Sequence, residues 1–150
     1  MINYVKGDAT NPQGESKKKI IVHICNDKNR WGAGFVMALS KKWKAPEESY
    51  RNMPKELMTL GQVMFIPVEN DIIVANMIAQ HDTQSINGIS PIRYGALKTC
   101  LELVDSMAKS IGADVHMPRI GCGLAGGNWE TVVKIIRQTI TVDVTVYDLF

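Results

Sequence analysis

Two glycine-rich segments carry the residues best suited to holding an anion. The longer one, Pro118 to Glu130, contains four glycines, and the shorter one reads Arg30-Trp31-Gly32-Ala33-Gly34. Each lies between an apolar run typical of a strand and a pattern typical of a helix, so backbone N–H groups could approach a ligand closely beside a helix start. One such loop alone is more simply a tight turn. Two of them favour a ligand with several phosphates, or with a phosphate beside a ribose, bound above the carboxyl ends of the strands.

A polar segment after a predicted strand supplies further candidates. It runs from residue 80 to 90 and begins with Gln80, His81 and Asp82, and loops at strand ends often carry functional groups. Adjacent residues of an extended loop point in different directions, so His81 and Asp82 do not form a ready acid–base couple and their role stays open. Gln80 could hydrogen-bond a ligand hydroxyl.

The elements that must position these residues alternate along the chain. Apolar runs rich in Val and Ile predict six strands, at residues 2–6, 19–24, 62–67, 72–77, 115–117 and 144–147. The short turn Glu69-Asn70-Asp71 makes the third and fourth strands an antiparallel hairpin, so the sheet must be mixed. Helical periodicity predicts a helix after Gly34 that ends before Pro46, a second over about residues 93–110 with Gly112 as its stop, and a third with Asn128 as its N-cap. We expect one α/β domain over residues 1–150.

Composition excludes several classes of protein. A net charge of +2 is too small for a long nucleic-acid footprint. The three cysteines, Cys25, Cys100 and Cys122, have no Cys-x-x-Cys spacing, so neither a metal site nor a disulfide framework is indicated. No apolar run is long enough for a signal peptide or a membrane span. We therefore expect a soluble, cytoplasmic protein that needs no metal or cofactor and has no membrane partner.

The longer glycine segment also permits a dinucleotide-binding interpretation. Gly121, Gly123 and Gly126 match the spacing of the dinucleotide fingerprint, and Asp148 follows where a ribose-binding acid is expected. That interpretation would put the first β-α-β unit at the C-terminal end of the chain and would leave the shorter glycine segment without a purpose. It is the weaker of the two.

Motifs spread over nearly the whole chain resemble those of a macrodomain. They are the segments Tyr4 to Thr10, His23-Ile24-Cys25-Asn26 followed by Trp31-Gly32-Ala33-Gly34, Pro118 to Leu124, and Thr145-Val146-Tyr147. The match is best to the branch that contains the ADP-ribose 1''-phosphate phosphatases and the small ADP-ribosyl-carboxylate hydrolases. The resemblance implies a three-layer fold, with a six-stranded mixed sheet sandwiched between helices, and an ADP-ribose ligand.

The resemblance also implies roles for individual residues. Asp8 would accept a hydrogen bond from the adenine amino group beside the Ala9 amide, although an aspartate after a glycine is also a turn former. Tyr147 would border the adenine or its ribose, or pack in the core. The remaining contacts would come from main-chain loops: Gly32, Ala33 and Gly34 at the distal ribose and a phosphate, and Gly121, Cys122, Gly123, Leu124 and Ala125 around the diphosphate, where Cys122 matters for its small size.

Catalysis is implied less directly. The carboxylate-deconjugating enzymes of this branch use a lysine after the fourth strand and an aspartate in the second glycine loop, where this chain has Gln80-His81 and Ala125. The phosphatase-like members share His-x-Cys-Asn, which implies that Asn26 binds the distal ribose and that His23 is a general base, a general acid or a phosphoryl acceptor. A buried core histidine is the alternative for His23.

We accordingly expect hydrolysis of ADP-ribose 1''-phosphate to ADP-ribose and phosphate. The alternatives are a non-catalytic reader of ADP-ribose or of an ADP-ribosylated protein, and a hydrolase that acts on O-acetyl-ADP-ribose or on an ADP-ribosylated side chain.

Overall fold

The strands form one twisted mixed sheet in the computed structural model of the chain, which describes residues 1–14, 18–123 and 125–149. Within these residues the sheet has six strands in the order β1-β6-β5-β2-β4-β3. They are β1 (Ile2–Lys6), β2 (Lys18–Asn26), β3 (Val63–Glu69), β4 (Ile72–Gln80), β5 (Ala113–Pro118) and β6 (Val144–Asp148). Only β3 runs antiparallel to its neighbour, so the carboxyl ends of the other five strands meet at one edge.

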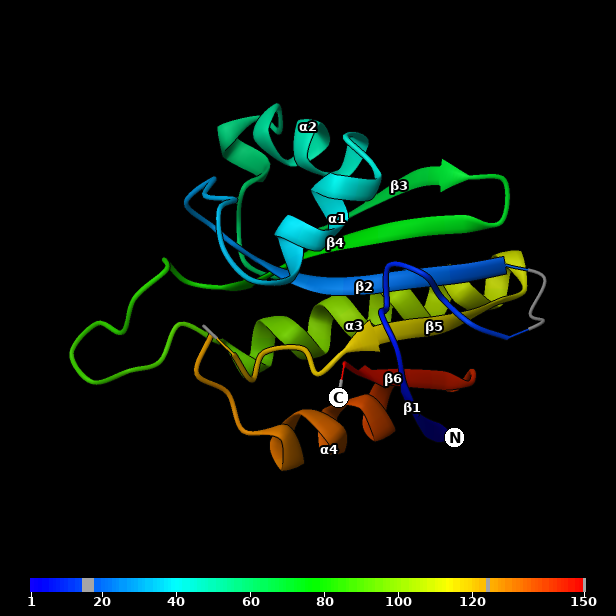
Figure 1. The fold of residues 1–150 in the computed structure, drawn as a ribbon. Coiled ribbons are helices and arrows are strands. Elements are labelled where there is room, and N and C mark those ends of the chain that lie inside the picture. Colours follow the sequence, from blue (N-terminus) through cyan, green and yellow to red (C-terminus); the bar gives the residue numbers. More distant parts are fainter. Residues whose placement is uncertain (15–17, 124, 150) are drawn as a thin grey trace.

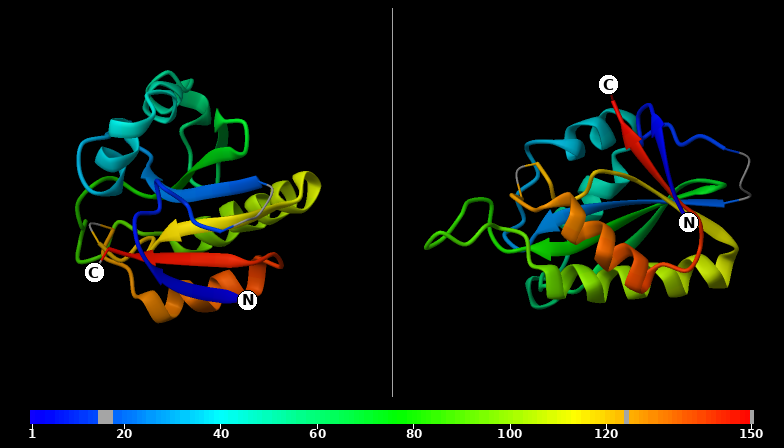
Figure 2. Two further views of the ribbon diagram at one scale, coloured as in Figure 1. Left: turned by 45° about the vertical axis from the view of Figure 1, so that its right-hand side comes forward. Right: turned by 90° about the horizontal axis from the view of Figure 1, so that it is seen from below.

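Helices cover both faces of the sheet, as Figures 1 and 2 show. The pair α1 (Phe35–Lys42) and α2 (Ala45–Arg51) lies on one face, and the pair α3 (Tyr94–Ile111) and α4 (Trp129–Thr139) lies on the other. Strand β2 serves both layers, because alternate side chains of a strand point to opposite faces. Ile20 and Val22 belong to the core under α3 and α4, whereas Ile21 and Cys25 belong to the core under α1 and α2. The predicted three-layer α/β fold is confirmed.

Two local signals placed helix ends correctly, whereas most strands begin or end one to three residues from the predicted bounds. Gly112 ends α3 in the left-handed conformation with φ 70°, and the Asn128 side chain accepts a hydrogen bond from the Thr131 amide at the start of α4. The sequence predicts Pro46 only as the stop of a helix, but it lies in the first turn of α2, where its missing N–H costs no hydrogen bond. Helix α2 and the short 3-10 helix Lys55–Leu57 were therefore missed.

Among the described residues, no helix combines the length and the apolar character of a transmembrane span.

Candidate functional site

A cavity of about 420 Å³ lies where β2, β4 and β5 end, a size typical of small-molecule sites. Its lining consists of residues 23–26, 30–36 and 118–121 together with Gln80, Thr83, Gly123 and Ala125. The two glycine-rich segments are 84 positions apart at their nearest, from Gly34 to Pro118, and they meet because the strand order places β5 beside β2. The structure thus joins both predicted anion-binding segments in one cavity.

The glycines around the cavity are of two kinds. Gly121 has φ 76°, and a Cβ there would lie 2.4 Å from the Ile92 side chain, so the fold itself requires glycine. Gly127 is equally constrained, because a Cβ would lie 2.4 Å from the Gly121 carbonyl oxygen. In contrast, a Cβ on Gly32 or Gly123 would meet no described atom within 4 Å. These two glycines have no packing reason to be small, and both line the cavity, so they leave room for a ligand.

Asn26 builds the shorter glycine segment from the end of β2. Its Oδ1 accepts hydrogen bonds from the amides of Lys28 (2.9 Å) and Arg30 (3.2 Å), and its Nδ2 donates to the Arg30 carbonyl at 2.7 Å. The buried Tyr50 hydroxyl, from α2, donates to the Asn26 carbonyl oxygen at 2.6 Å and lies 2.9 Å from Oδ1. Asn26 therefore lines the cavity and also fixes the loop conformation.

His23 borders the same cavity from beneath and is only 2% exposed. The Asn76 amide nitrogen donates to the Pro46 carbonyl, so its Oδ1 faces His23 Nε2 at 2.5 Å as an acceptor. Nε2 then carries the proton, and Nδ1 is the unprotonated ring nitrogen, with the Cys25 Sγ 3.9 Å away. Burial lowers the pKa of His23 to about 4 despite the Asn76 hydrogen bond, so the imidazole is neutral near pH 7. Its ring packs edge to face on Trp31, with the centroids 5.5 Å apart. This environment is that of a core histidine at the cavity wall, and its catalytic role stays a prediction.

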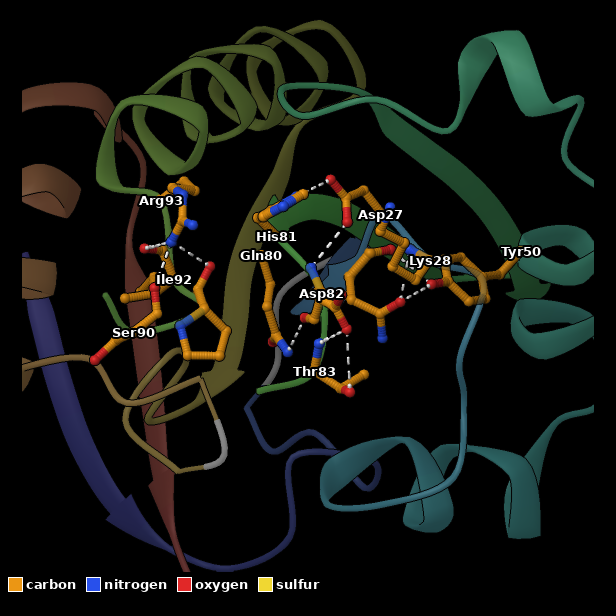
Figure 3. Close-up of polar contacts among 12 residues, drawn as sticks. Asp27, Lys28, Tyr50, Gln80, His81, Asp82, Thr83, Ser90, Ile92 and Arg93 are labelled. Atoms are coloured by element: carbon orange, nitrogen blue, oxygen red, sulfur yellow. Dashed lines mark hydrogen bonds and ion pairs between the residues drawn. The ribbon is translucent and has the colours of Figure 1, made fainter. Parts of the chain in front are cut away.

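Asp27 joins the loops that leave β2 and β4, as Figure 3 shows. Its carboxylate contacts His81 Nδ1 at 2.7 Å and accepts the Asp82 amide at 2.9 Å. Asp82 has φ 60° and accepts the Thr83 amide on its own carboxylate at 2.7 Å. The Asp82 pKa is lowered chiefly by that Thr83 N–H, so it stays ionised.

The polar segment that follows β4 only partly lines the cavity. The Asp27 side chain is 14% exposed and holds the two loops together through His81 and Asp82. His81 and Asp82 do not line the cavity, whereas Gln80 and Thr83 on either side of them do. Thr83 was missed, and the sequence offers no signal for it beyond its place in the loop.

Four predicted ligand contacts lie outside the cavity lining: Asp8, Ala9, Cys122 and Tyr147. The exposed Asp8 uses Oδ1 to accept the Thr10 amide and hydroxyl, both at 2.8 Å, which is the turn that sequence logic offered as the alternative. Tyr147 is 3% exposed, and its hydroxyl accepts the Gln13 amide and contacts His116 Nδ1. Leu124, another predicted contact of the longer loop, lies outside the described residues. The roles of these residues toward a ligand stay predictions.

Cys122 is half-buried, and burial raises the pKa of its thiol. A neutral thiol is a poor nucleophile, which agrees with a role for small size rather than reactivity. Its Sγ lies 3.4 Å from the Ile120 carbonyl oxygen.

The charges around the cavity favour an anion. Among its described lining residues there are two arginines, Arg30 and Arg119, and no Asp, Glu or Lys. Asp148 is engaged by Arg119 through two hydrogen bonds at 2.6 and 3.0 Å, so it is not free to hold a ribose as the dinucleotide interpretation requires. The described residues include no group of three or more side chains suited to hold a metal ion.

Comparison with known proteins gives relatives along the whole chain, although no family model matches it. Chromodomain-helicase-DNA-binding protein 1-like of Mus musculus is 35% identical over 91% of this chain, which spans only 16% of that protein. ADP-ribose glycohydrolase OARD1 of Bos taurus is 31% identical, with 99% of this chain and 91% of that protein covered. ADP-ribose 1''-phosphate phosphatase of Candida albicans is 25% identical, with 98% and 99% covered.

A solved structure of a macrodomain protein from Streptomyces coelicolor superposes with a TM-score of 0.83 at 42% identity, and 99% of each chain is covered. The Bos taurus relative, matched over nearly its whole length, and the Streptomyces coelicolor macrodomain structure agree with the family that the sequence motifs indicated. The chain therefore belongs to the macrodomain family.

Proposed function

We propose that the protein binds ADP-ribose in this cavity and hydrolyses ADP-ribose 1''-phosphate to ADP-ribose and phosphate. One observation carries the binding part: two main-chain loops with spare room at Gly32 and Gly123 face a cavity that no described carboxylate lines. Such loops hold a diphosphate by backbone N–H groups, which point at the anion without any side-chain charge. The names of the relatives from Candida albicans and Bos taurus support ADP-ribose as the ligand and a hydrolase as the class of activity.

The proposed reaction relies on positioning and on main-chain donors. A water molecule attacks the phosphorus, the bond from phosphorus to the distal ribose oxygen breaks, and a proton passes to that oxygen. Backbone amides preorganised toward developing negative charge are worth about 3 to 4 kcal/mol of transition-state stabilisation in other enzymes. Asn26 acts as a positioning residue, because its amide holds the loop that would carry the distal ribose. His23 is neutral near pH 7 and its Nδ1 is unprotonated, with the Cys25 Sγ 3.9 Å away, but its low pKa makes it a weak base.

Phosphorus NMR of ADP-ribose 1''-phosphate mixed with the protein tests both parts. We expect the diphosphate signals to shift and inorganic phosphate to appear. The Gly123→Val variant should do neither, because its side chain would occupy ligand space without disturbing the fold. Shifted signals without phosphate release would leave a reader, or a hydrolase with another substrate, and unshifted signals would contradict ADP-ribose binding itself.

A projecting hairpin favours a second candidate, an ADP-ribosyl group carried on a protein. Residues Ile86 to Ile89 form a tight two-residue turn, with φ 53° at Asn87 and 76° at Gly88 and paired main-chain hydrogen bonds of 2.9 and 3.1 Å. Ile86 and Ile89 are 41% and 59% exposed at its tip. Figures 1 and 2 show this loop extending beyond the carboxyl edge of the sheet.

The stem of the hairpin is fixed beside the cavity. Arg93 Nη1 donates to the carbonyls of Ser90, Pro91 and Ile92 (Figure 3), and the Ile92 amide donates to the Ala125 carbonyl at 3.0 Å. A polypeptide attached to a bound ADP-ribose would meet this tip. The double variant Ile86→Ser, Ile89→Ser should weaken binding of an ADP-ribosylated protein but not of free ADP-ribose. Leu103→Ser, at a 46% exposed leucine of α3, is the control.

A further inference from the structure

Arg119 is the cationic side chain of the cavity whose position is most closely fixed. Its Nε and Nη2 donate to the two carboxylate oxygens of Asp148 at 2.6 and 3.0 Å. This fork uses the Nε–Nη2 edge, one of the two edges by which a guanidinium can clamp a phosphate, and it neutralises the charge locally. An arginine beside a diphosphate site is ordinarily assigned to the phosphates, but here one of its two edges is already occupied by a carboxylate.

Two aromatic rings pack against the same guanidinium. Its Cζ lies 5.2 Å from the centroid of the Tyr4 ring and 5.3 Å from that of the Trp129 ring. The rings themselves pack edge to face with centroids 6.5 Å apart, and Trp129 Nε1 donates to the Tyr4 hydroxyl at 3.2 Å. Rings on opposite sides of the guanidinium would have centroids separated by nearly the sum of the first two distances. The two rings therefore do not enclose the guanidinium from opposite sides, and the Arg119 side chain remains 43% exposed.

The position of this group selects which part of the ligand it meets. Arg119 lines the cavity at the end of β5, which is paired with β6, and the Gly7 amide donates to the Asp148 carbonyl at 2.8 Å. The turn that carries Asp8 therefore begins directly beside the Arg119–Asp148 pair. The distal-ribose segment, residues 30–34, leaves β2 on the opposite side of β5. The two ends of the cavity are thus chemically different.

We propose that Arg119 is a stacking platform for a purine base, and that it contributes to base selectivity by its flat face instead of binding the diphosphate. Guanidinium planes stack on nucleobases, and Arg keeps this geometry best when its rotamers are fixed. Asp148, Tyr4 and Trp129 supply that fixation. This inference rests on the proposed function, because it assumes that an ADP-ribose unit occupies the cavity.

Two variants distinguish stacking from phosphate binding, because the two roles predict opposite changes in the ADP-ribose affinity of Asp148→Asn. Arg119→Lys keeps the charge but loses the plane, so it should weaken ADP-ribose binding by about tenfold. Asp148→Asn frees the guanidinium and adds net positive charge near the diphosphate. If Arg119 stacks, this variant also weakens binding, because the plane is no longer held; if Arg119 binds phosphate, the variant strengthens it.

Ligands without adenine complete the experiment. Ligand-detected NMR with ribose 5-phosphate should give the same affinity for wild type, Arg119→Lys and Asp148→Asn, whereas inosine diphosphate ribose, which keeps a purine face, should follow ADP-ribose. Arg137→Lys, at an exposed position of α4, is the control for an Arg-to-Lys change. Unchanged ADP-ribose affinity in Arg119→Lys, or tighter binding in Asp148→Asn, would overturn the proposal. A wild-type protein that does not bind ADP-ribose would instead overturn the proposed function.

Discussion

Replacement of His23 by glutamine tests the environment at the inner wall of the cavity. Glutamine does not titrate in the accessible pH range, and its amide can still donate to the buried Oδ1 of Asn76, which the imidazole Nε2 contacts in the native protein. The variant therefore removes the ionisable group while it keeps a donor for its partner. We expect the free energy of unfolding to respond to pH differently in the two proteins.

The size of the effect follows from the pKa of His23. Burial lowers it from 6.5 to about 4, so the unfolded chain takes up this proton as the pH falls through 6.5 while the native state does not. The native state is thus destabilised progressively below pH 6.5, and the loss is complete near pH 4. The full shift corresponds to about 3 kcal/mol, of which about 2 kcal/mol is lost by about pH 5.

Urea denaturation at about pH 7.5 and about pH 5 measures this quantity. Asp105 and Asp148 also have lowered pKa values, so they too reduce stability as the pH falls. They titrate in both proteins, and their effect cancels in the difference between wild type and His23→Gln. That difference should change by about 2 kcal/mol between the two pH values, with the wild type losing more stability.

A difference that stays constant with pH would refute the reasoning, because native His23 would then accept a proton as readily as the unfolded chain. The same variant in the phosphorus NMR assay reports on catalysis. Loss of phosphate release with unchanged diphosphate shifts would favour a catalytic His23, and retained release would leave it a core residue of the cavity wall.

Three further outcomes are expected. Gly123→Val should lower ADP-ribose affinity by about tenfold or more, as loss of a hydrogen bond to a charged group does. Its melting temperature should match that of Gly95→Val, which changes another glycine with open space around it. Isothermal titration and thermal denaturation check this, and an affinity equal to that of the wild type would contradict the site. Tyr50→Phe should lower the free energy of unfolding, measured by urea denaturation, by about 1 to 3 kcal/mol, because the buried Asn26 oxygens lose their Tyr50 donor. An unchanged urea midpoint would refute a stabilising role for this hydroxyl. Alkylation followed by mass spectrometry should modify Cys122 before the two buried cysteines, which react only on unfolding, and equal rates in the native state would contradict their burial.

Structural features that depend on residues close together in the chain could be predicted from the sequence. Apolar runs rich in Val and Ile predicted β2 and β4, the short turn at residues 69–71 required the antiparallel β3–β4 pair, and Gly112 and Asn128 marked helix ends. The glycine spacing located both cavity loops for the same reason, since positive φ and close main-chain approach restrict the residue at that very position. Helix α2 is the exception, because a proline reads equally as a stop or as a first-turn residue.

Contacts between distant residues depended on the tertiary structure. Asp27 and His81 are 54 positions apart and meet only because β2 and β4 are neighbours, and Arg119 and Asp148, 29 positions apart, meet only because β5 and β6 are. The sequence by itself determined the backbone loops and the α/β fold class, because these follow from local conformational preference and periodicity, and its motifs indicated the family. Only the tertiary structure decided which side chains are free toward the cavity, because burial of His23 and the pairing of Arg119 arise from strand order and packing.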